Sequence, residues 1–75
     1  MVRSSQISGK ELGRALTRLG FQFKSQKGSH MKFVRLHGGV KEVIIVPSHK
    51  VLRKGTLRGI LKQLNLNIEK LEKLL

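Results

Sequence analysis

Apolar residues in the first part of the chain recur at a helical spacing. They follow the i, i+3, i+4, i+7 pattern of one buried helix face, and they are Leu12, Ala15, Leu16 and Leu19. The segment just before them, Ser8-Gly9-Lys10-Glu11, has the serine and glutamate of a capping box, in which each side chain accepts a hydrogen bond from the other residue's backbone N–H. Gly20 favours the left-handed conformation that ends many helices. These features predict a helix that starts after Ser8 and stops at Gly20.

From residue 21 the apolar period changes to two, which is typical of strands with one buried face. In the first strand, which is expected to end at Lys27-Gly28, the odd-numbered residues of 21–25 face one way and the even-numbered residues of 22–26 face the other. In the second strand, about residues 29–36, Met31 and the aromatic residue 33 share a face. The three aromatic residues are Phe21, Phe23 and Phe33. Their positions on apolar strand faces predict core residues rather than stacking platforms for bases.

The second half of the chain continues with a turn, a strand and two helices. His37-Gly38-Gly39 is expected to join antiparallel strands, and the third strand, about residues 40–46, ends before Pro47. After a basic loop over residues 48–55, Thr56 is a candidate N-cap of a second helix. The apolar stripe of that helix is Leu57, Ile60, Leu61 and Leu64. Asn67 is a candidate N-cap of a short last helix, whose apolar residues are Ile68, Leu71 and Leu75.

The predicted fold is therefore a small α+β sandwich with the order α-β-β-β-α and a short extra C-terminal helix. Its antiparallel sheet would carry the helices on one face. This order is similar to that of double-stranded-RNA-binding domains. A chain of 75 residues has room for one domain, so residues 1–75 are expected to form a single unit.

Charge narrows the range of partners. Sixteen Lys and Arg residues stand against four acidic residues, which gives a formal net charge of +12. Such an excess points to a polyanion or an acidic protein as partner. No run approaches the roughly 20 apolar residues of a membrane-spanning helix, and the first residues lack the apolar core of a signal peptide, so a soluble cytoplasmic protein without a membrane partner is expected.

Several kinds of chemistry are disfavoured by composition. Four scattered glutamates are too few for a two-carboxylate hydrolase or a magnesium cage. The absence of cysteine excludes a disulfide framework and a cysteine-bearing zinc site. The three histidines lie far apart in sequence among cations, so a zinc site is not expected, and neither is a small-molecule cofactor.

His30 is the strongest candidate for chemistry. It follows Gly28-Ser29, a small and flexible pair that leaves room for a substrate beside the imidazole ring. Three lysines lie near it in sequence, and strand alternation lets Lys24 and Lys32 share its face, with Lys27 close by. Cations around an imidazole attract phosphate. The alternative is an ordinary exposed histidine on a strand.

The other histidines and the basic loop give weaker signals. His37 is expected to be a turn residue beside two glycines. His49 could contact a phosphate or cap a carbonyl, and the two interpretations stand equal. The cations that surround the start of the second helix resemble a phosphate-contact site, because helix N-terminal amides and cationic side chains attract oxyanions. They are Lys50, Arg53, Lys54 and Arg58.

Together these segments resemble the HicA-type toxins, also called the YcfA-like family, which are small mRNA interferases of bacterial and archaeal toxin–antitoxin pairs. The resemblance covers about residues 7–69. It rests on Ser8-Gly9-Lys10-Glu11-Leu12, Gly20-Phe21, Gln26-Lys27-Gly28-Ser29-His30, Val46-Pro47 with His49-Lys50, and Gly55-Thr56-Leu57 through Ile60-Leu61-Lys62-Gln63. Five ordered blocks are specific, whereas Gly-Ser-His alone would not be.

The resemblance implies a double-stranded-RNA-binding-like fold, ribosome-independent cleavage of mRNA, and neutralisation by a HicB-type antitoxin. The catalytic histidine of the family's Gly-Ser-His motif corresponds to His30. Family members often continue with a second histidine or an aromatic residue, where this chain has Met31, and the alternation directs that side chain toward the core. Two other interpretations are a non-catalytic RNA-binding module and a basic protein whose ligand is an acidic partner.

Overall fold

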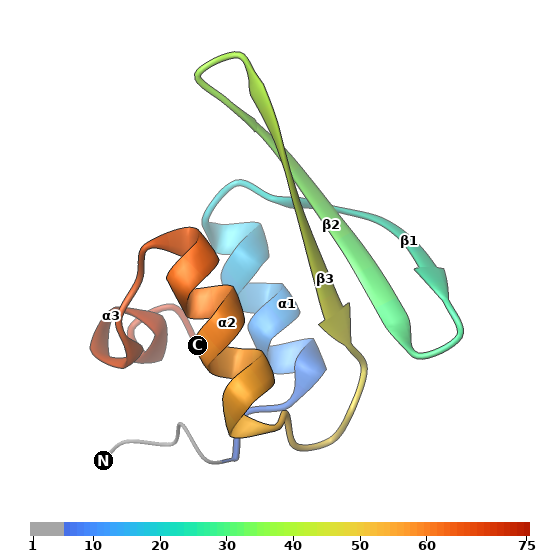
Figure 1. Cartoon of the computed structure of the whole chain (residues 1–75), viewed down its shortest axis with the longest axis vertical. Coiled ribbons are helices and arrows are strands. Elements are labelled where there is room, and N and C mark those ends of the chain that lie inside the picture. The colour runs from blue at the N-terminus through green and yellow to red at the C-terminus, as the bar shows by residue number, and fades with distance from the viewer. Residues whose placement is uncertain (1–5) are drawn as a thin grey trace.

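The order of elements agrees with the α-β-β-β-α prediction. The computed structural model describes residues 6–75. Its elements are α1 (Gly9–Arg18), β1 (Gln22–Lys27), β2 (His30–His37), β3 (Val40–Pro47), α2 (Lys54–Leu64) and α3 (Ile68–Glu72). Helices α1 and α2 lie on one face of the sheet, and α3 packs beside α2 (Figure 1). The predicted α+β class is confirmed.

Helix α1 has both of its predicted ends. Ser8 Oγ accepts a hydrogen bond from the Glu11 N–H at 3.0 Å, and Glu11 Oε1 accepts one from the Ser8 N–H at 3.1 Å. The helix stops where Gly20 takes a φ of 98°, a conformation that costs an L residue with a Cβ far more than glycine. The capping box fixes where the helix begins.

The three strands form an antiparallel meander in the order β1-β2-β3. Positive φ angles at Gly38 and Gly39 produce the tight β2–β3 turn, as predicted from the Gly-Gly pair. Each residue of β2 faces one residue of β3, from the His30 and Pro47 pair at one end to the His37 and Val40 pair at the other. The β2–β3 hairpin extends past the helices (Figure 1).

A bulge in β1 corrects the predicted alternation. Phe23 faces Phe33, but the next pair along the ladder is Ser25 with Lys32, so Lys24 is the extra residue. Beyond the bulge the faces of β1 are exchanged. The register therefore places Ser25 and Lys27, rather than Lys24, directly across from the outward-facing residues of β2.

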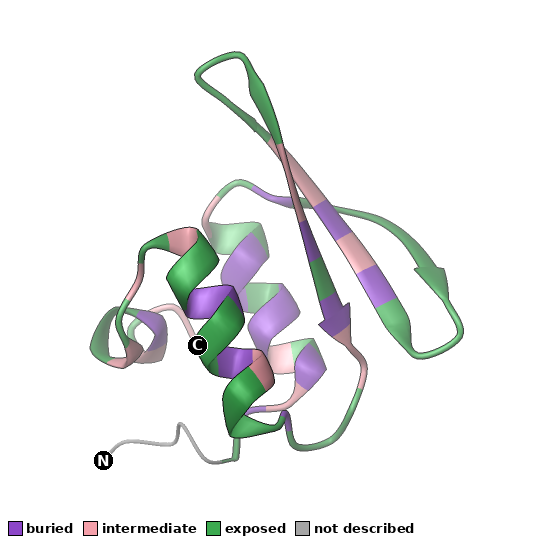
Figure 2. Cartoon of the chain, viewed as in Figure 1, coloured by how far each residue is buried: buried purple, intermediate pink, exposed green. Residues whose placement is uncertain are grey.

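The core lies between the sheet and the helices (Figure 2). Met31 and Phe33 of β2 are buried, as predicted. Phe21 is buried as well, but the expectation that Phe23 joins the core is wrong, because its side chain is 54% exposed. The edge strand β1 has no buried residue, and Phe23 contacts the Phe33 ring edge to face at 5.7 Å between centroids.

The second helix differs from prediction at its start, whereas the third begins where predicted. Helix α2 begins at Lys54, not after Thr56, and its N-cap is Arg53, which makes no side-chain capping hydrogen bond. Helix α3 begins as predicted, with the Asn67 side chain accepting a hydrogen bond from the Lys70 N–H at 2.8 Å. Leu71 of α3 is fully buried, so the C-terminal segment packs against the core.

Arg35 packs against the edge of the core, on Phe21 and on the end of α1. Its guanidinium lies 4.4 Å from the centroid of the Phe21 ring and donates a hydrogen bond to the Leu19 carbonyl at the end of α1. The same group pairs with Glu42 at 2.8 Å. The hydrogen bond from Arg35 is the main reason why the pKa of Glu42 lies below its ordinary value.

Gly9 allows α1 to touch the chain that leaves β3. A Cβ at this position would lie 2.0 Å from the carbonyl oxygen of Pro47. By contrast, a Cβ at Gly59 in α2 would have nothing within 4 Å. A side chain is therefore excluded at Gly9 but has room at Gly59.

We expect Gly9→Ala to lower the free energy of unfolding by about 2 kcal/mol or more, because the clash is with backbone. Gly59→Ala, the matched control, should raise it by about 0.5–1 kcal/mol through helix propensity. Urea unfolding of both variants measures the difference. Equal effects of the two substitutions would contradict the close approach at Gly9.

Candidate functional site

His30 lies at the first position of the central strand, on the face of the sheet opposite the helices. Its neighbour Met31 is buried and points toward the helices, so the exposed imidazole belongs to the outer face. Its cross-strand partners are Lys27 on β1 and Pro47 on β3. The ring therefore stands at the end of the sheet with a lysine directly beside it.

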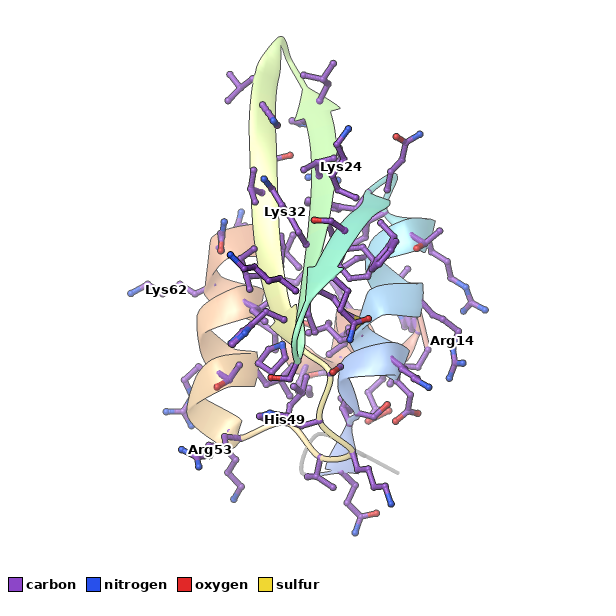
Figure 3. The ribbon with its side chains drawn as sticks, turned by 90° about the vertical axis from the view of Figure 1, so that its right-hand side faces the viewer. Arg14, Lys24, Lys32, His49, Arg53 and Lys62 are labelled. Carbon is purple, nitrogen blue, oxygen red and sulfur yellow. The ribbon has the colours of Figure 1, made fainter. Side chains whose placement is uncertain are left out.

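A second lysine lies along the same face. Lys32 is two residues from His30 on β2, which returns its side chain to the outer face, and its cross-strand partners are Ser25 and Ile45. Lys32 is half-buried, whereas Lys27 is exposed. Figure 3 views this face and shows Lys32 on the sheet and Lys24 farther along it. His30 thus has a cation across the strand pair and another along its own strand.

Backbone hydrogen bonds hold the loop after β3 against the same end of the sheet. The Ser48 N–H donates to the Ser29 carbonyl at 2.7 Å, and the Gly9 N–H donates to the His49 carbonyl at 2.9 Å. The His49 side chain is exposed and lies past the end of the sheet in Figure 3. The loop therefore brings a second imidazole to the end where His30 stands.

The predicted contact residues fall into two groups joined by this loop. The group at the end of the sheet is Lys27, Gly28, Ser29, His30, Lys32 and His49. The second group, all exposed, is Lys50, Arg53, Lys54 and Arg58, on the loop and at the start of α2. Lys24 is exposed in the bulge and belongs to neither group. Figure 3 shows Arg53 at the end of α2 that is nearer His49.

The match to a known family covers the elements that carry both groups. The family model for the HicA toxin of bacterial toxin–antitoxin systems matches residues 9–66, from the first residue of α1 to just past α2. The chain belongs to the HicA toxin family. It is therefore a toxin of a toxin–antitoxin system, and an antitoxin partner follows from that. A comparison with curated proteins gave no match.

The surface of this HicA toxin around His30 is open. A depression of about 410 Å³ lies elsewhere on the sheet, with Gly20, Gln22 and Arg35 in its lining. Another, of about 290 Å³, lies between α2 and α3 and is lined by Lys54, Leu57, Arg58, Leu61 and Ile68. Neither depression includes His30, whose side chain is exposed.

The described residues 6–75 contain no group of three or more His, Cys, Asp or Glu side chains placed to hold a metal ion. Glu42, the acid on the sheet, pairs with Arg35 toward the other end of β3.

Over the same residues 6–75, no helix of this HicA toxin has the length and apolar character needed to cross a membrane.

Sequence reasoning missed Ser25, and although it named His49 as a possible phosphate contact, it did not place that residue beside His30. Ser25 faces Lys32 on the outer surface only because of the bulge at Lys24, and the alternating pattern gives no signal of that bulge. The position of His49 beside the sheet end depends on hydrogen bonds to Ser29 and Gly9. Those contacts join segments far apart in sequence, so spacing along the chain could not reveal them.

Proposed function

We propose that this HicA toxin is an mRNA interferase, an endoribonuclease in which His30 is the general base. The observation that supports the proposal most is the placement of an exposed imidazole at the sheet end, with Lys27 directly across the strand pair and Lys32 on the same face. A substrate held by its phosphates would present its riboses to that ring. Action on mRNA would place the protein in the cytoplasm.

The reaction needs a base and a site for developing negative charge. His30 takes the proton of a ribose 2′-hydroxyl, whose oxygen attacks the adjacent phosphorus in line, and the bond from phosphorus to the 5′-oxygen breaks. Lys27 and Lys32 offset the charge that grows on the phosphate oxygens. This route requires no metal ion or cofactor. DNA lacks the 2′-hydroxyl and would bind without being cut.

The remaining basic residues bind the RNA backbone. Two exposed residues of the β1–β2 turn, Gly28 and Ser29, leave space for a nucleotide, and the loop and the start of α2 supply cations on one side of it. The residues in this role are Lys24, His49, Lys50, Arg53, Lys54 and Arg58. The open surface suits a polymer better than a small molecule.

We expect His30→Ala to lower the rate of RNA cleavage about 10²- to 10⁴-fold with little change in RNA affinity, because the lysines remain. Lys27→Ala should lower both rate and affinity. Cleavage of a labelled oligonucleotide in excess EDTA, with binding measured by anisotropy, tests both variants.

His37→Ala is the matched control, because His37 lies at the other end of β2, about 23 Å away at the usual rise per residue. It should cleave at the parent rate. Parent-like cleavage by His30→Ala would rule out His30 as the base. RNA binding without cleavage by any form would favour the non-catalytic RNA-binding module.

The antitoxin is proposed to be a HicB-type protein that covers this site with acidic groups. The net charge of +12 favours an acidic partner, and a nuclease must be blocked in the cell that makes it. We expect amide hydrogen exchange over residues 27–32 and 53–58 to slow in the complex. The control segment is the β2–β3 turn, which should exchange at the same rate. Unchanged exchange in both expected segments would contradict steric blocking.

A further inference from the structure

We infer that His49 is the general acid of the cleavage reaction, the partner of His30. The inference rests on the proposed ribonuclease function and adds a second catalytic residue to it. It comes from the arrangement of the backbone at the sheet end. The sequence alone left His49 as a phosphate contact or a carbonyl cap.

The backbone brings the two histidines within the span of one phosphodiester. His30 faces Pro47 across the β2–β3 ladder, and the hydrogen bond from Ser48 to Ser29 continues that ladder by one step. Facing residues lie about 4.5–5.5 Å apart, and two further residues extend the chain by at most about 7 Å, so the Cα atoms of His30 and His49 lie within about 13 Å. At this Cα separation the two side chains are long enough for both rings to contact one phosphodiester when they turn toward it.

The position of His49 is fixed from both sides, whereas its ring is free. Its carbonyl accepts the Gly9 N–H at 2.9 Å, and three residues later the Leu52 N–H donates to the Ile7 carbonyl at 2.8 Å. Among residues 6–75 neither the His30 imidazole nor the His49 imidazole has a hydrogen-bond partner, and both side chains are exposed. An anchored backbone with an unused ring is the arrangement that a proton donor needs.

The proton balance of the reaction requires such a donor. His30 removes the proton of the 2′-hydroxyl, the 2′-oxygen bonds to phosphorus, and the 5′-oxygen leaves with the electrons of the broken bond. His49 gives a proton to that oxygen, which produces a 2′,3′-cyclic phosphate and a 5′-hydroxyl. Imidazole gives and takes protons near neutral pH, whereas lysine and arginine hold theirs. Afterwards His30 is protonated and His49 neutral, and exchange with water restores both.

The test replaces one atom of the substrate. The parent protein is first used to map the linkage that it cleaves in an RNA oligonucleotide. A second oligonucleotide then carries sulfur in place of the 5′-oxygen at that linkage. A thiolate leaves without being protonated, so loss of a general acid should matter only for the oxygen linkage, whereas loss of the base should matter for both.

His49→Ala should lower cleavage of the oxygen linkage at least about 10²-fold and of the sulfur linkage less than 10-fold. His49→Gln, which keeps a polar side chain at this exposed position, should do the same. His30→Ala should slow cleavage of both linkages, and His37→Ala should slow neither.

Equal losses on the two linkages, or no loss with His49→Ala, would overturn the general-acid role. Equal losses together with weaker RNA binding would leave His49 with the phosphate-contact role alone. A parent protein that cuts neither linkage would refute the ribonuclease proposal itself. Parent cleavage that requires His30 but not His49 would refute only this inference.

Discussion

The structure depends on a close contact between the first residue of α1 and the chain that leaves β3. Gly9 donates a hydrogen bond to the His49 carbonyl at 2.9 Å, and its missing side chain leaves room for the Pro47 carbonyl. Next to it, Ser48 binds the Ser29 carbonyl at 2.7 Å. These contacts join the start of a helix, the start of the central strand and the loop after β3, and they hold that loop beside His30.

The positions of the cationic side chains follow from the same packing of helix, strand and loop. Because the helices cover the inner face of the sheet, the polar residues of β1 and β2 are left on the outer face, where Lys27 and Lys32 surround His30. The loop after Pro47 turns back toward α2 and carries further cations beside the sheet end. The result is a cationic, open surface rather than a pocket. Such a surface suits a polyanionic chain, and an acidic partner could cover it.

Much of the fold could be predicted because its signals are local. The Ser8 and Glu11 capping box, the Gly38-Gly39 turn and the Asn67 cap each depend on residues a few positions apart. Two of the failures concern features that neighbouring strands decide, and one concerns a helix start. The bulge at Lys24 and the exposure of Phe23 result from pairing at the sheet edge. The early start of α2 uses no side-chain cap, so no capping residue marks it.

In the candidate site, too, the features with local signals were predictable and those that depend on the folded chain were not. The exposed position of His30 at the start of β2 was predictable from Gly28-Ser29 and the strand alternation after it. Its relation to His49 was not, since 19 positions separate them and hydrogen bonds of the folded chain bring them together. The lysine beside it was also not fully predictable: the turn at Gly28 and Ser29 pairs Lys27 with His30, whereas the predicted alternation put Lys24 on that face and gave no signal of the bulge.

The chemical identity of the RNA ends after cleavage tests the central claim most directly. In the proposed reaction a ribose 2′-oxygen is the attacking group at the His30 end of the sheet. Mass spectrometry of the products should therefore find 2′,3′-cyclic phosphate on one fragment and 5′-hydroxyl on the other. A 3′-hydroxyl with a 5′-phosphate would mean that water attacked the phosphorus, and that result would contradict the account.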